Sequence, residues 1–233
     1  MDVAAIDGTA VVGAIRLASA RTGVDFDYLV AQARVESGLD PRAAAPTSSA
    51  RGLFQFTQGT WLDTVRRHGA EHGLGDAAAI LKRGATPEER VAILDLRLDA
   101  GASSAMAAAF AQDNAATLER RLGRTANATD LYLAHFLGPA GAVRFLRARD
   151  AAPDAAAASA VLPAAARANA GVFTAAGGRA RTLDEVYARF EAKLGSAPQR
   201  ATEQGGTSLP RTGTVLPVAA ARTAYLLLAD LGA

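Results

Sequence analysis

Residues 24–56 decide the fold of this 233-residue chain: VDFDYLVAQARVESGLDPRAAAPTSSARGLFQF. Asp25 is typical of a helix N-cap, because its carboxylate can accept hydrogen bonds from the first free backbone amides. Apolar residues then recur with helical spacing. Gly38 ends the pattern, because glycine readily adopts the left-handed conformation that closes a helix. The stretch therefore predicts a helix from Phe26 to about Ser37, followed by an irregular loop.

Glu36 stands at the edge of the apolar stripe of this helix, one turn after Ala33 and two turns after Leu29. A carboxylate at such an edge is partly removed from water, and desolvation disfavours its charged form. We therefore expect a raised pKa, which keeps a proton available for general acid catalysis on a glycosidic oxygen. A salt bridge to Arg34 or Arg42 is the ordinary alternative for a glutamate placed in this way.

Most of the remaining chain also carries helix signals, and β-forming residues dominate no window. The run Thr86-Pro87-Glu88-Glu89 combines a cap, a proline at the first helical position and a capping-box glutamate. Val91, Leu94 and Leu98 are expected to be the buried stripe of that helix. The fold class is thus predicted to be mainly α, with little or no β structure. Further helices are predicted at residues 60–68, 104–122, 130–137, 139–149 and 182–194, with short helices or a connector at 151–167.

The sequence also predicts three parts along the chain. Residues 1–195 are expected to form one domain, and residues 196–214 have the Gly, Ser, Thr, Pro and Gln content of a linker. Residues 215–233 form a short apolar segment that is too short to cross a bilayer. We expect either a helix docked on the domain or a segment that binds a protein partner.

Composition excludes several classes of function. The 25 basic and 23 acidic residues give a net charge of +2 without a basic block, which argues against nucleic acid as a partner. The lack of cysteine removes disulfides, thiolate metal sites and cysteine nucleophiles. His68 and His72 have the spacing of a helical metal pair but no third ligand nearby in the sequence, so we predict no metal and no other cofactor. Residues 1–9 lack the pattern of a signal peptide.

Two motifs occur in a characteristic order. Glu36-Ser37 closes a helix, and after a loop of small residues comes Gly52-Leu53-Phe54-Gln55. This arrangement resembles the lytic transglycosylases of the SLT type, which have a goose-type lysozyme-like fold. The resemblance is close over residues 24–68 and looser to about Leu194. It implies a lysozyme-like helical catalytic domain.

The resemblance also implies roles for these residues. Glu36 would protonate the leaving oxygen and then act as the base. Ser37 would hydrogen-bond near the catalytic group or the sugar, Gln55 would bind substrate through its amide, and Phe54 would line the cleft. Without the resemblance, Ser37 and Gln55 would be read as ordinary turn residues.

Two further family markers have counterparts later in the sequence, and one of them is altered. The segment Ala134-His135-Phe136-Leu137-Gly138 corresponds to a motif of the form Ala-Tyr-Asn-x-Gly, so His135 replaces the tyrosine. His135 is expected either to hydrogen-bond the sugar or Glu36, or to be structural. Tyr187 is the best match to a late tyrosine beside the catalytic glutamate, with simple packing of its helix as the alternative.

The implied substrate is peptidoglycan, cleaved at the β-1,4 bond between N-acetylmuramic acid and N-acetylglucosamine with formation of 1,6-anhydromuramoyl ends. A monomer in the periplasm or cell envelope is the expected setting. Two alternatives remain open at this point. One is a muramidase that hydrolyses the same bond with a second carboxylate, for which Asp40, Asp63 and Asp113 are present. The other is a wall-binding or assembly module without turnover.

Overall fold

The computed structural model describes residues 3–46, 48–154 and 157–195, with side chains from residue 8 onward. The predicted linker (196–214) and apolar segment (215–233) lie outside the described residues. Within those ranges there are isolated β-bridges but no strand, so the predicted mainly α fold is confirmed. The helices are α1 (Val3–Thr22), α2 (Phe26–Ser37), α3 (Gln58–His68), α4 (Gly75–Arg83), α5 (Pro87–Asp95), η1 (Leu96–Leu98), α6 (Ala100–Leu122), α7 (Ala128–Ala151), α8 (Ala158–Val161), α9 (Pro163–Ala168), α10 (Ala170–Phe173), η2 (Ala176–Gly178) and α11 (Leu183–Gly195).

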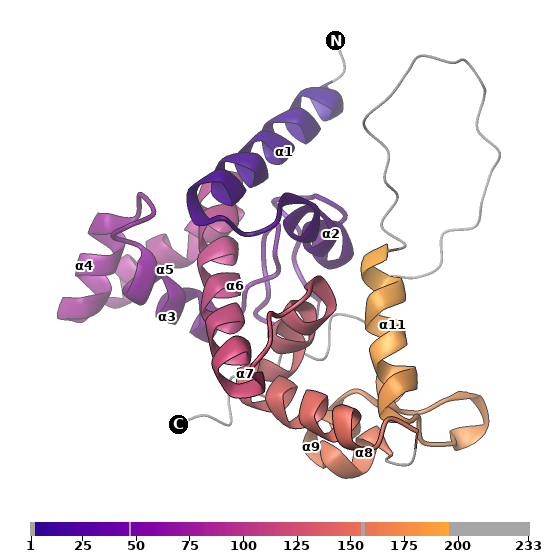
Figure 1. Cartoon of the computed structure of the whole chain (residues 1–233). Coiled ribbons are helices and arrows are strands. Elements are labelled where there is room, and N and C mark those ends of the chain that lie inside the picture. The colour runs from indigo at the N-terminus through magenta and orange to yellow at the C-terminus, as the bar shows by residue number, and fades with distance from the viewer. Residues whose placement is uncertain (1–2, 47, 155–156, 196–233) are drawn as a thin grey trace, which may run out of the picture.

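Helix α6 runs through the middle of the molecule and packs against α1, α2, α3 and α7 (Figure 1). It begins four residues before the predicted start, because the Asp99 carboxylate caps it by accepting from the Ala102 amide at 2.7 Å. Its buried side chains are mostly small, which allows neighbouring helices to approach closely. They include Ala102, Ser103, Ser104, Ala107, Ala108, Ala109 and Ala111.

Helix α1 has no counterpart among the predicted elements. Val11, Ile15 and Ala18 are buried and lie on one face, and the helix packs chiefly on α6. The apolar pattern is hard to recognise because alanines and glycines fill much of the rest of the helix. Packing of this face on α6 stabilises the helix.

The predicted start of α5 is confirmed, because Thr86 and Glu89 form the reciprocal capping box. The predicted buried stripe is wrong in two of its three positions. Val91 is 59% exposed and Leu98 is 36% exposed, whereas Ile93 and Leu94 are buried. The α-helix ends at Asp95 and Leu98 lies in the 3-10 turn η1 that follows, so α-helical spacing no longer predicts the face on which Leu98 lies.

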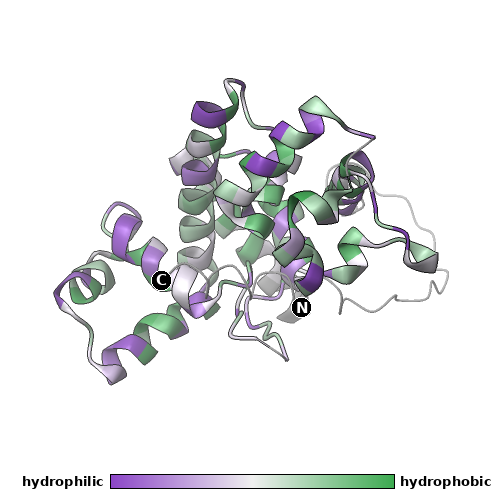
Figure 2. Cartoon of the chain, turned by 90° about the horizontal axis from the view of Figure 1, so that it is seen from below, coloured by the Kyte–Doolittle hydropathy of each residue, from purple (hydrophilic) through white to green (hydrophobic). Residues whose placement is uncertain are grey.

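Helix α7 is interrupted at Gly138, whose φ of 69° lies outside the helical region, and Pro139 follows. The predicted division into two helices at this point is confirmed. The alanine-rich segment that follows contains the short helices α8 and α9. Helix α11 then packs back onto α7 and α2. Figure 2 shows hydrophobic residues gathered where the helices meet. Among the described residues, no helix is both long and apolar enough to span a bilayer.

Candidate active site

The end of α2 presents Glu36. The helix begins as predicted, with the Asp25 carboxylate accepting from the Tyr28 amide at 2.7 Å. It ends at Gly38, which has a φ of 68° and donates to the Arg34 carbonyl at 2.9 Å. The Glu36 side chain is 11% exposed. The local sequence thus places a largely buried carboxyl group within two residues of a helix terminus.

Two side chains of α7 meet one oxygen of this carboxyl group. The Tyr132 hydroxyl donates to Glu36 Oε1 at 3.1 Å, and His135 Nε2 lies 3.5 Å from the same atom. The two rings are one helical turn apart and stack, with centroids 5.9 Å apart and an interplanar angle of 11°. Stacking restricts both rings, so the two polar groups are held in place around Oε1.

Gln32 fixes the orientation of His135. Its side-chain amide nitrogen lies 3.1 Å from His135 Nδ1, and both side chains are buried. An amide N–H can only donate, so Nδ1 accepts and the ring proton is assigned to Nε2, on the side that faces Glu36. Gln32 and Glu36 are one turn apart on α2, so one helix carries both the carboxyl group and the residue that orients its neighbour.

Lys193 of α11 extends this set of contacts. Its ammonium nitrogen donates to the Tyr132 hydroxyl at 3.1 Å. Burial, together with the nearby Glu36 carboxylate, raises the pKa of Tyr132 well above its ordinary value. The Tyr132 hydroxyl is therefore protonated throughout the neutral range and can serve as a permanent donor to Glu36.

Ser37 joins the two sequence motifs. Its hydroxyl oxygen lies 2.8 Å from the Leu53 carbonyl and 3.0 Å from the Ala33 carbonyl. The end of α2 and the Gly52–Gln55 turn are therefore side by side. The Ser37 contacts described here are with backbone atoms, so its immediate effect is to hold this turn against the helix that carries Glu36.

Gln55 and Phe54 require a correction. The Gln55 side chain is buried, and its amide nitrogen donates to the carbonyls of Ala43 and Gly52 at 3.1 and 2.8 Å. These contacts hold the loop together, and Gln55 itself has a φ of 49°. Phe54 is fully buried in the core and does not line an open surface. Both side chains point inward because the turn is packed against the centre of the domain.

Tyr187 does not reach Glu36, contrary to expectation. Its hydroxyl lies 3.1 Å from Asp130 Oδ1 and also exchanges hydrogen bonds with Asn127, which caps α7. The hydroxyl beside Glu36 belongs to Tyr132. The sequence offers one signal for this, because Tyr132 precedes His135 by one helical turn and must share its face.

Arg97 is a buried residue that the sequence analysis did not single out. Its guanidinium donates to the carbonyls of Leu94, Ser49 and Phe56 at 2.8, 2.7 and 3.2 Å. Burial lowers the pKa of Arg97, and the neighbouring Arg51 charge adds to this effect. These bonds tie both ends of the Gly52–Gln55 turn to the segment after α5.

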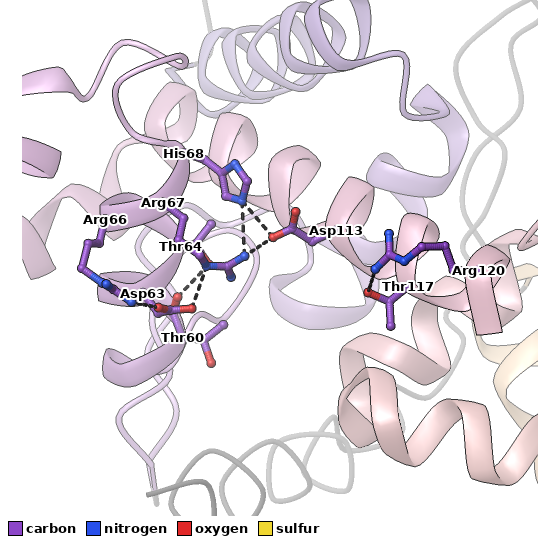
Figure 3. Close-up of polar contacts among 9 residues, drawn as sticks. All are labelled: Thr60, Asp63, Thr64, Arg66, Arg67, His68, Asp113, Thr117 and Arg120. Carbon is purple, nitrogen blue, oxygen red and sulfur yellow. Dashed lines mark hydrogen bonds and ion pairs between the residues drawn. The ribbon is translucent and has the colours of Figure 1, made fainter.

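The three aspartates considered as a second carboxylate have other partners. Asp63 pairs with Arg66 and Arg67, and Asp113 pairs with Arg67 and His68, which joins α3 to α6 (Figure 3). Burial acts to raise the pKa of Asp63, but the hydrogen bonds and charges of the two arginines outweigh it, so the net shift is downward.

Asp40 Oδ1 accepts from the backbone amide of Arg42 at 2.8 Å, as in an ordinary turn. His68, one of the two spaced histidines, is engaged with Asp113 at 2.8 Å. Within the described residues, no group of three His, Asp or Glu side chains is placed to hold a metal ion.

A comparison with family models finds a match in the N-terminal part of the described residues. Residues 13–77 match the family described as the Transglycosylase SLT domain. The match includes Glu36-Ser37 and the Gly52–Gln55 turn, and it ends before Tyr132, His135 and Lys193. The resemblance inferred from the motifs is therefore confirmed: residues 13–77 of this chain are similar to the transglycosylase SLT domain, and the described residues form a mainly α-helical fold consistent with that lysozyme-like family.

Proposed function

We propose that this protein is a peptidoglycan lytic transglycosylase that cleaves the β-1,4 bond between N-acetylmuramic acid and N-acetylglucosamine and leaves 1,6-anhydromuramoyl ends. The observation that carries the proposal is the environment of Glu36. Its side chain is 11% exposed, and Tyr132 and His135 both approach Oε1. The other oxygen, Oε2, is then the atom that can carry a transferable proton.

The proposed reaction uses this carboxyl group twice. In the first step Glu36 Oε2–H protonates the glycosidic oxygen, and the bond from that oxygen to the anomeric carbon breaks. The resulting carboxylate is stabilised by the Tyr132 hydroxyl and by the Nε2–H of His135. In the second step the 6-hydroxyl oxygen of the muramic acid attacks the anomeric carbon, and Glu36 takes its proton. The enzyme is thereby restored, and no water is consumed.

One carboxyl group suffices for this reaction, whereas a hydrolase of the usual kind needs two. The described partners of Asp40, Asp63 and Asp113 favour the transglycosylase over the muramidase, because each of these carboxylates is engaged in a turn or in ion pairs. We propose Glu36 as the catalytic residue, Tyr132 and His135 as the groups that stabilise its carboxylate, and Ser37 and Gln55 as residues that shape the adjacent loop. The substrate places the protein in the periplasm or cell envelope, and we propose that it acts as a monomer.

Incubation with purified sacculi, followed by mass spectrometry of the released muropeptides, tests the proposal. Anhydro ends are one water lighter than reducing ends, so the product identifies the reaction. We expect anhydromuropeptides. Products with reducing ends would establish the muramidase instead. Co-sedimentation of the protein with sacculi, without soluble products, would establish a binding module.

Replacing Tyr132 by Phe is expected to lower the rate of muropeptide release by about tenfold to a hundredfold, because a hydrogen bond to a charged group contributes about 1.5–3 kcal/mol. The matched control is Tyr187→Phe, which also removes one buried hydroxyl. Its partners are Asn127 and Asp130, so it should lower the melting temperature while leaving the rate within about twofold of wild type. Equal loss of activity in both variants would contradict the assignment of Tyr132.

A further inference from the structure

Lys193 lies far outside the matched segment in the sequence, yet it contacts the Tyr132 hydroxyl of the site. It sits in the last turn of α11, three residues after Phe190. The Phe190 ring packs edge-on against Tyr132, with centroids 5.7 Å apart, and the Lys193 ammonium lies 5.4 Å from the centroid of the Tyr132 ring. Apolar packing of α11 thus delivers the ammonium group to the residue that contacts Glu36.

The directions of the hydrogen bonds are determined by the chemistry of the groups. An ammonium group can only donate, so the Tyr132 oxygen accepts from Lys193 and uses its single proton for Glu36. Two contacts of 3.1 Å in series place the ammonium nitrogen no more than about 6 Å from Glu36 Oε1, a separation at which opposite charges in a partly buried site attract appreciably.

We propose that Lys193 is a positioning residue that acts through the Tyr132 hydroxyl to stabilise the carboxylate form of Glu36. This inference rests on the proposed function. In the first step of that reaction the Glu36 carboxylate forms, so a nearby positive charge lowers the energy of the state that the step produces. A polarised Tyr132 hydroxyl is also a stronger donor than an isolated one.

The charged and titratable groups around Glu36 and Lys193 come from three helices. Glu36 and Tyr28 lie on α2, Tyr132 and His135 on α7, and Arg189 with Lys193 on α11. Burial lowers the pKa of Lys193, the Glu36 charge opposes this shift, and Arg189 adds to it. Because the Lys193 charge favours the carboxylate form of Glu36, loss of that charge should make the Glu36 proton harder to remove. Glu36 should then stay protonated to higher pH.

The test is a carbon-13 NMR titration of glutamate carboxyl groups in the full chain, with the Glu36 signal assigned by its loss in Glu36→Gln. Lys193→Met should move the Glu36 titration midpoint upward by about one pH unit, while Lys193→Arg, which keeps the charge, should move it much less. Lys82→Met is the matched control, because it makes the same change at an exposed position of α4. An unchanged midpoint in Lys193→Met would overturn the proposal.

Turnover of sacculi provides the second readout. In Lys193→Met the rate should fall by about tenfold, and the alkaline limb of the pH–rate profile should move to higher pH, because free Glu36 must be protonated to begin the reaction. If Lys193 had a purely structural role, its replacement would lower the rate without moving the alkaline limb of the pH–rate profile. That result would contradict the proposal. If Lys193→Met does not fold by circular dichroism, Lys193→Gln replaces it in both measurements.

The two proposals can fail separately. The titration needs no substrate, so it reports on Lys193 even if the wild-type protein releases no muropeptides. Inactive wild-type protein would overturn the proposed function, whereas an unshifted Glu36 midpoint in an active enzyme would overturn only the role of Lys193.

Discussion

Replacing Glu36 by Gln is expected to lower the release of anhydromuropeptides from sacculi by about a thousandfold or more, because the proposed reaction uses this one carboxyl group for both proton transfers. Glutamine is close in size and can still accept the hydrogen bond from Tyr132 through its side-chain oxygen. The fold should therefore be preserved, and co-sedimentation with sacculi should be retained.

The matched control for this variant is Glu119→Gln, which makes the same change at an exposed position of α6. Its rate and melting temperature should equal those of the wild type. Full activity of Glu36→Gln would mean that another group supplies the proton, and the assignment of the site would have to be abandoned. Loss of activity together with a large drop in melting temperature would instead reveal a structural role for Glu36.

Replacing Gly52 by Ala is expected to lower the free energy of unfolding by about 3–5 kcal/mol, which is large for the addition of one methyl group. A Cβ atom at this position would lie 1.9 Å from the Arg97 carbonyl oxygen, and the φ of 81° already disfavours any residue with a side chain. Neither the Arg97 backbone nor the turn can move freely, because Arg97 also donates to the carbonyls of Ser49 and Phe56.

Gly73→Ala separates the cost of the clash with Arg97 from the cost of the left-handed backbone conformation. Gly73 has a φ of 82°, nearly the same as Gly52, but a Cβ atom there would meet nothing within 4 Å. This variant should lose only about 1 kcal/mol, the cost of a side chain in the left-handed region. Chemical denaturation of both variants measures the difference, which is the part due to the clash. Equal losses would mean that the turn can shift away from Arg97.

The site draws on three separate parts of the chain. The matched segment, residues 13–77, contributes Glu36 and the turn beside it. The groups that contact Glu36 come from α7, and the ammonium group behind Tyr132 comes from α11. Substitutions of Tyr132, His135 and Lys193 should therefore change catalysis even though α7 and α11 lie outside the recognised motif.

Sequence alone determined the features that depend on a few neighbouring residues. The caps at Asp25 and Thr86, the helix end at Gly38 and the break at Gly138 are all present in the structure. Each arises from hydrogen bonds or backbone preferences that span about four residues, so local sequence is sufficient to predict them.

Only the tertiary structure decided which side chains surround Glu36. Tyr132 is 96 residues from Glu36 and Lys193 is 61 residues from Tyr132, so helix packing determines whether they meet. The same packing buries Phe54 and Gln55, and it places the Tyr187 hydroxyl against Asn127, the N-cap of α7. Helical periodicity specifies which residues share a face, but the partner of that face depends on the approach of helices distant in sequence.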